Sequence, residues 1–121
     1  MKIPSFIDFK ALTINRTANT VEGGKSRTEL QAVDPQGDTV VIRRECPTRS
    51  NGGGMPQVEL TVSYKDHESP DVAERKPIGT EEAYDLYRCL KQAKNANGVN
   101  VADTGWIISD LARKGGAGGA R

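Results

Sequence analysis

Apolar and polar residues alternate most regularly at residues 57–65. The apolar positions in this segment are Val58, Leu60, Val62 and Tyr64. A two-residue period is typical of a strand with one buried face and one polar face. Residues 39–46 are rich in β-branched side chains, which favour strands. Both segments are therefore predicted strands, and the glycine run at residues 52–54 between them is predicted to be a hairpin connection.

The N-terminal part of the chain is predicted to form another hairpin. Residues 9–14 alternate, residues 15–19 have turn chemistry, and residues 20–22 would form a short return arm. Two more strands are predicted at residues 27–33 and, more weakly, at residues 72–76. The predicted sheet is thus an antiparallel meander, made of the N-terminal hairpin and about four further strands.

The hydrophobic period becomes helical after residue 79. Thr80 followed by Glu81 and Glu82 favours a helix start, because acidic side chains interact favourably with the positive end of the helix dipole. We predict a first helix at about residues 80–95 and a second at residues 101–114. The apolar residues at helical spacing are Ala83, Leu86, Tyr87, Leu90 and Ala93 in the first helix and Trp106, Ile107, Ile108 and Leu111 in the second.

Length and composition predict one domain with a thin core. The 121 residues are 36% hydrophobic and 5% aromatic, which is low for a globular chain of this size. We assign residues 1–114 to a single α+β domain and residues 115–121 to a glycine-rich tail. The low apolar content predicts that a partner surface completes the core.

The charge and the cysteines argue against several classes of function. A formal net charge of +1 gives no overall field for nucleic acid or membranes, so RNA binding would need a local patch. Cys46 and Cys89 lack metal-ligand spacing and are interpreted as small buried apolar residues in a reducing cytoplasm. No segment has the apolar length of a signal peptide or a transmembrane helix. We expect no metal site, no cofactor and no membrane contact.

The one histidine, His67, lies in a polar segment between Asp66 and Glu68. A histidine beside carboxylates is chemically able to act as a general base. The sequence pattern pairs no nucleophile with it, so a solvated loop histidine is the favoured interpretation. We do not expect an enzyme, and an enzyme built around His67 stays the weakest alternative.

The polar face of the predicted sheet is the candidate binding surface. Arg43 shares a face with Thr39 and Val41, and the polar residues of the segment 57–65 would lie beside it if the two strands pair. Their side chains suit contacts to phosphates and base edges. The predicted RNA-contacting residues are Arg43, Gln57, Thr61, Ser63 and Lys65. Glu59 and Glu45 are the residues expected to lower the positive charge of this face, and an ordinary solvent-exposed face is an equally favoured interpretation.

The order of predicted elements resembles that of the coat proteins of single-stranded RNA bacteriophages, the levivirus-like coats, over almost the whole chain. The resemblance is strongest at residues 40–46 and 57–64, which a loop containing Arg, Ser and Asn joins. Residues 77–87 also look like the strand-to-helix junction of those coats.

This resemblance implies an obligate homodimer whose two sheets join edge to edge and whose helices lie over the partner. The helix-packing residues would be Tyr84, Tyr87, Leu90, Trp106 and Leu111. The dimers would assemble in the bacterial cytoplasm into an icosahedral virion shell. Its sheets would face genomic RNA, including an operator hairpin, and no small-molecule substrate is implied.

The resemblance also bears on single positions. Arg43, Thr61, Ser63 and Lys65 occupy positions that face RNA in that family. The loop at residues 66–71 is shorter than the loop that surrounds the capsid symmetry axes in well-known members, so the vertex contacts would differ.

A second class of function stays open from the sequence. A small phage-encoded inhibitor or adaptor would use a sheet edge or the helix pair to bind a host protein complex. A monodisperse monomer that binds one host protein would favour this class, and particles that protect RNA would favour a capsid protein.

Overall fold

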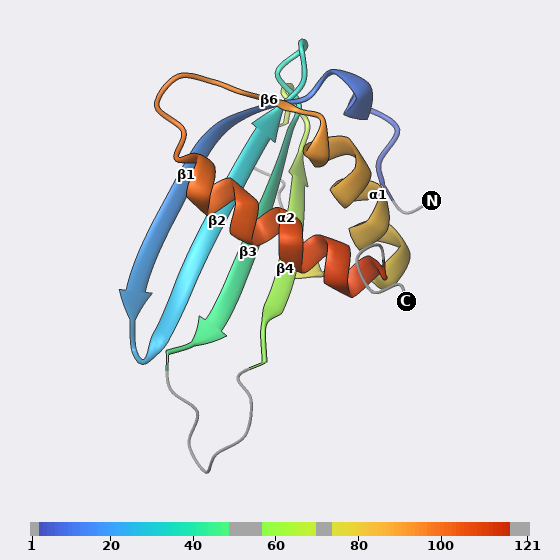
Figure 1. The fold of residues 1–121 in the computed structure, drawn as a ribbon. Helices are drawn as coiled ribbons and strands as arrows, with labels where there is room; N and C mark the ends of the chain where they lie inside the picture. Colours follow the sequence, from blue (N-terminus) through green and yellow to red (C-terminus); the bar gives the residue numbers. More distant parts are fainter. Residues whose placement is uncertain (1–2, 49–56, 70–73, 117–121) are drawn as a thin grey trace.

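Four long antiparallel strands form the middle of the sheet (Figure 1). They are β1 (Thr13–Glu22), β2 (Lys25–Val33), β3 (Thr39–Pro47) and β4 (Glu59–Lys65). Two short strands border them, β5 (Lys76–Pro77) antiparallel to β4 and β6 (Lys94–Asn95) parallel to β1. The order across the sheet is β5-β4-β3-β2-β1-β6. The helices are α1 (Thr80–Lys91) and α2 (Val101–Gly115). The computed structural model describes residues 3–48, 57–69 and 74–116, and it is α+β as predicted.

The first hairpin has its turn at Gly23 and Gly24, whereas the sequence predicted it at residues 15–19. β1 continues through residues 15–19 to Glu22, and both glycines have positive φ, 62° and 77°. Two consecutive positive φ values are those of a type I′ turn, whose twist matches the strands that it joins. The predicted turn was wrong because polar residues are compatible with an edge strand, while the glycine pair is the stronger turn signal.

The segment before β1 is not a strand either. Phe9–Ala11 form a short 3-10 helix, η1, and the Asp8 side chain caps it by accepting a hydrogen bond from the Lys10 amide (3.1 Å). Of the weak strand predicted at residues 72–76, the structure describes residues 74–76. Lys76 and the following Pro77 pair with β4. The predicted connection at residues 52–54 lies outside the described residues.

The predicted pairing of the two most regular strands is confirmed. β3 and β4 pair with Arg43 opposite Thr61 and Ile42 opposite Val62. Because side chains alternate along a strand, each of these pairs lies on one face of the sheet. Ile42 and Val62 are fully buried together with Leu30 of β2, so they belong to the core face.

Both helices lie on one side of the sheet (Figure 1). α2 contacts β1, β2 and β3 and packs against α1. Leu86 and Leu90 of α1 are buried in the same core as Ile107 and Leu111 of α2. The resemblance implies helices that lie over a partner, but in the single chain they cover the chain's own sheet.

The ends of the helices differ slightly from the prediction. α1 ends at Lys91 rather than near residue 95, because Lys94 and Asn95 pair with the start of β1 instead. α2 begins at the predicted residue and ends at Gly115, which the sequence had assigned to the tail. Gly116, with φ 79°, provides the left-handed residue that ends the helix.

Candidate functional site

We call the face of the sheet opposite the helices the open face. Four of the five predicted RNA-contacting residues lie on it, since Arg43 pairs with Thr61, and Ser63 and Lys65 follow Thr61 on the same face of β4. Gln57 is exposed and lies two residues before β4 begins. β3 and β4 therefore bring the predicted side chains together.

Exposure separates these residues. Ser63 is only 4% exposed, and its neighbour across the strand pair, Val41, is buried as well. Arg43, Thr61 and Lys65 are intermediate in exposure. Ser63 is therefore poorly placed to contact a ligand, although the period of the strand put it on the correct face.

Carboxylates neutralise much of the positive charge on the open face. Arg43 forms ion pairs with Glu29 (3.3 Å) and Glu45 (3.8 Å), and Arg27 forms one with Glu45 (2.7 Å). Lys65 forms no ion pair with a described residue. The face is therefore a network of alternating charges rather than a strong positive patch, and the sequence had identified only Glu59 and Glu45 as compensating charges.

Apart from Nε of Arg27, which lies 2.7 Å from Glu45, three polar atoms on the open face are buried without a hydrogen-bond partner among the described residues. They are Nε of Arg43 and the hydroxyl oxygens of Thr39 and Thr61. Buried polar atoms in folded proteins are usually paired. The chain itself therefore leaves the hydrogen-bonding capacity of this face partly unused.

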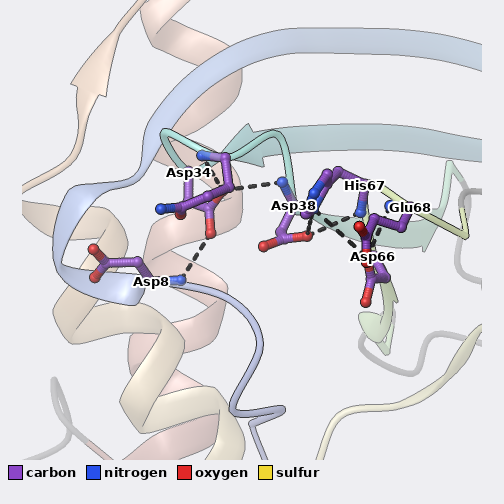
Figure 2. Close-up of polar contacts among 7 residues, drawn as sticks. Asp8, Asp34, Asp38, Asp66, His67 and Glu68 are labelled. Carbon is purple, nitrogen blue, oxygen red and sulfur yellow. Dashed lines mark hydrogen bonds and ion pairs between the residues drawn. The ribbon is translucent and has the colours of Figure 1, made fainter.

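His67 lies in a network of hydrogen bonds at one end of the sheet (Figure 2). Oδ1 of Asp38 accepts a hydrogen bond from the His67 amide (2.9 Å) and lies 2.7 Å from its Nδ1. These hydrogen bonds lower the pKa of Asp38, and the bond to Asp38 raises the pKa of His67. His67 is exposed in the loop after β4, as predicted, and the structure adds that it joins this loop to the buried Asp38.

Asp34 continues the same network (Figure 2). Its carboxylate accepts hydrogen bonds from the amides of Asp38 (3.0 Å), Gln36 (2.9 Å) and Asp8 (2.9 Å). The N-terminal segment, the turn between β2 and β3 and the loop after β4 are thus held together by two buried carboxylates. These hydrogen bonds therefore have a structural role.

Side chains of this network also have the geometry of a cation site. Ligand atoms of Asp38, Asp66 and His67 lie within 4.8 Å of one another. The hydrogen bond between Asp38 and His67 accounts for that proximity without an ion. The polar side-chain contacts of His67 are to Asp38 and Asp66, so no nucleophile among the described residues is paired with it.

The predicted helix-packing residues divide into two groups. Leu90 and Leu111 are buried in the chain's own core, and Tyr87 packs partly buried against it. Tyr84 and Trp106 are exposed, Trp106 by 54%. Of these five predicted residues, only the two exposed rings are therefore accessible to a partner.

An ion pair between the sheet and α2 was not predicted. Arg44 shares the core face with Ile42 and bonds to Asp110, which is itself buried. The Arg44 guanidinium also lies 5.1 Å from the centre of the Trp106 ring. The sequence signal that could have revealed this ion pair is Arg44 itself, a charged residue at a core-facing position of β3.

Another buried carboxylate lies at the start of α1. Glu82 accepts a hydrogen bond from the Tyr64 hydroxyl (2.6 Å), and Lys76 lies 3.8 Å from it. Burial and the neighbouring carboxylate raise the pKa of Tyr64. Glu82 was predicted as an acidic residue near the helix dipole, and the structure adds that it joins α1 to β4.

A groove of about 880 Å³ lies between η1, the start of β1 and α1. Tyr84 and Tyr87 line it, each with a cation over its ring, Arg88 at 5.6 Å and Lys91 at 5.5 Å. Cys89 also lines the groove, and burial raises the pKa of its thiol, which disfavours the reactive thiolate.

Comparison of the chain with protein-family models, with curated protein sequences and with solved structures found no match. Within the described residues, neither helix is long and apolar enough to cross a membrane.

Proposed function

We propose that the chain is a coat protein of the single-stranded RNA bacteriophage type, which forms homodimers, assembles into a virion shell and binds genomic RNA. The observation that carries the proposal is the open face. It is a broad polar surface of four antiparallel strands, and both helices lie on the opposite side (Figure 1). The order of elements, with two helices after the meander, agrees with the resemblance seen in the sequence.

The chemistry of the open face supports RNA as the ligand. RNA-binding sheets present side chains that contact phosphates, sugar hydroxyls and base edges. Arg43, Thr61 and Lys65 supply donors of these kinds from neighbouring strands. The Nε of Arg43 and the hydroxyl of Thr61 have no partner among the described residues but are buried, so they contact a ligand only if neighbouring side chains move aside. The ion pairs of Arg43 moderate the attraction, so binding depends on geometry as well as on charge.

Expression of the chain in bacteria tests the proposal. The wild-type chain should form particles visible by electron microscopy that protect RNA from nuclease. Combined Arg43→Gln and Lys65→Gln substitutions should lower the amount of protected RNA severalfold, because both remove a positive charge from the open face. Combined Lys10→Gln and Lys114→Gln substitutions are the matched control, since they also remove two positive charges and both lysines are exposed outside the open face, on η1 and α2.

Two results would contradict the proposal. One is a chain that stays a small monomer under native conditions at high concentration. The other is an unchanged amount of protected RNA in the double variant, which would show that RNA does not contact the open face.

The exposed rings of α1 and α2 favour a second candidate function. Tyr84 and Trp106 lie on the helix side and are accessible, as an inhibitor or adaptor of a host protein complex requires. In that case the chain would be monodisperse and would bind one host protein, and Trp106→Ala would abolish the complex while Lys65→Gln would not.

A further inference from the structure

The outer edge of β1 is unpaired over most of its length. β6 pairs with β1 only at Thr13 and Ile14, so nothing in the described part of the chain pairs with the outer edge of residues 15–22. Figure 1 shows this stretch along the border of the sheet. Unpaired amide and carbonyl groups of an edge strand are a template for another strand.

Natural proteins usually block such an edge with proline, lysine or a bulge. Residues 16–22 contain neither proline nor lysine. The bulge of β1 lies at its start, between Ile14 and Arg16, and leaves the rest of the strand regular. Val21 is 70% exposed near the end of this edge. The edge is therefore long, and its charged side chains, Arg16 and Glu22, lie only at its two ends.

We propose that residues 16–22 of β1 pair antiparallel with the same residues of a second copy, around a twofold axis at Asn19. The inference rests on the proposed self-assembly and names one contact that the assembly uses. Three properties of the strand support it: the direction of its backbone groups, its charges and its side-chain pairs.

The turn after β1 determines the direction of the backbone groups. Glu22 and Lys25 lie opposite each other on either side of the two-residue turn. In such a hairpin these flanking residues form a hydrogen-bonded pair, so the amide and carbonyl of Glu22 point toward β2. The direction alternates along a strand, and the groups of Thr17, Asn19 and Val21 therefore point away from the sheet.

Residues that point outward must pair with one another across an antiparallel contact. A twofold axis at Asn19 satisfies this condition, because it places Thr17 opposite Val21 and Asn19 opposite its own copy. The three hydrogen-bonded pairs would supply about six backbone hydrogen bonds. Thr17 and Val21 are both β-branched, a type that packs well across strands.

The charges select this register among the allowed ones. It places Arg16 of each copy opposite Glu22 of the other, which gives two symmetric pairs of opposite charge. Arg16 forms no ion pair with a described residue, and Glu22 has only a 3.9 Å contact with Arg27 while its side chain is 80% exposed. A shift to the next allowed register would place Thr20 or Gly24 opposite Arg16 and lose both pairs.

Charge exchange tests the register directly. Arg16→Glu should weaken self-association about tenfold, because the introduced carboxylate would lie opposite Glu22 of the other copy and repel it. Glu22→Arg should weaken it to a similar extent for the converse reason. The double substitution exchanges the charges within each pair and should restore the wild-type dissociation constant, measured by sedimentation at low salt, with circular dichroism to establish that each variant is folded.

A cysteine at the axis gives a second test. In a background in which Cys46 and Cys89 are replaced by serine, Asn19→Cys should form a disulfide-linked dimer on mild oxidation. Residues opposite each other in a hydrogen-bonded pair have Cα atoms about 5.5 Å apart, which is within the range of a disulfide. Ala18→Cys is the control, since Ala18 would lie opposite Thr20 and about 7–8 Å from its own copy.

The outcomes separate the inference from the proposed function. Single charge variants that associate like the wild type, a folded double variant that stays weak, or no Asn19→Cys crosslink would overturn the pairing of β1, whereas RNA-filled particles in the same samples would still support a coat protein. A crosslinked dimer that forms no particles and protects no RNA would support the pairing of β1 and contradict the coat function.

Discussion

Arg44 and Asp110 form the most enclosed ion pair among the described residues. Their side chains are 13% and 5% exposed, and they join β3 to α2. Arg113 donates to the other carboxylate oxygen of Asp110 at 2.7 Å, but its side chain is 71% exposed. Removal of one partner from a buried ion pair leaves an unpaired charge, which costs much more than the loss of a surface contact.

Asp110→Asn should therefore lower the free energy of unfolding by about 3 kcal/mol, because the Arg44 guanidinium loses its counter-charge in a buried position. Arg113→Ala is the matched control and should cost less than about 1 kcal/mol, since it removes an exposed partner of the same carboxylate. Urea unfolding of both variants measures the difference. Equal losses would show that the Arg44–Asp110 pair is not the stabilising contact.

The contact between Asp38 and His67 makes stability depend on pH. The pKa of His67 is raised above its ordinary value of 6.5, so its contribution is fully present below pH 6.5 and is lost as pH rises through the higher pKa of the folded state. The lowered pKa of Asp38 acts in the opposite sense, and its contribution is lost as pH falls through a value under 3.8. The contact therefore stabilises the fold between these two limits.

His67→Gln should reduce the free energy of unfolding more at pH 5.5 than at pH 8.5, because glutamine cannot carry the charge that Asp38 stabilises. Urea unfolding at the two pH values measures this difference. Glu68→Gln changes a neighbouring charge without touching Asp38 and should show a smaller dependence on pH. A His67→Gln effect that is the same at both pH values would contradict the ionic nature of the contact.

At the scale of elements, α1 and α2 approach each other closely at Gly115. A Cβ atom on Gly115 would lie 2.6 Å from the amide nitrogen of Tyr84 and 2.7 Å from its Cα. Both are backbone atoms of α1, which cannot move aside as a flexible side chain can. By contrast, a Cβ atom on Gly105, also in α2, would meet nothing within 4 Å.

The two glycines of α2 should respond in opposite directions to alanine. Gly115→Ala should lower stability by about 1–3 kcal/mol, because the helices must separate to admit the methyl group. Gly105→Ala should raise it by about 0.5–1 kcal/mol, because alanine has the higher helix propensity and there is space for it. Thermal unfolding compares the two variants, and a stabilised Gly115→Ala variant would contradict the close approach of the helices.

The same elements show what the sequence could predict. The period of residues 57–65 identified the core face of β4, and helical spacing identified both helices, because these signals are local. The predicted hairpin at residues 15–19 and the end of α1 were wrong, since both depend on tertiary pairing. β1 continues through the polar residues 15–19 because β2 pairs with this part of the strand. Lys94 lies beyond the end of α1 because it pairs with the start of β1.

At the scale of the whole molecule, the candidate site was predicted in outline but not in its electrostatics. Alternation placed Arg43, Thr61 and Lys65 on one face, as observed. It could not show that β2 contributes Glu29 to the same face, because that requires the register between β2 and β3. The ion pairs of Arg43 are therefore a property of the assembled sheet.

Glu45 neutralises part of the positive charge on the open face, because it forms ion pairs with both Arg27 and Arg43. If RNA binds the open face, Glu45→Gln should raise RNA affinity and steepen its dependence on salt. Arg27 would keep only its 3.9 Å contact with Glu22 and Arg43 only its ion pair with Glu29, and each guanidinium that then contacts phosphate would add a slope of about −0.7. Glu59→Gln is the matched control, because Glu59 lies directly opposite Glu45, changes the net charge equally, and forms no ion pair with a described residue. Filter binding of RNA over a range of salt concentrations compares the two slopes, and equal slopes would mean that the arginines of the open face do not contact RNA.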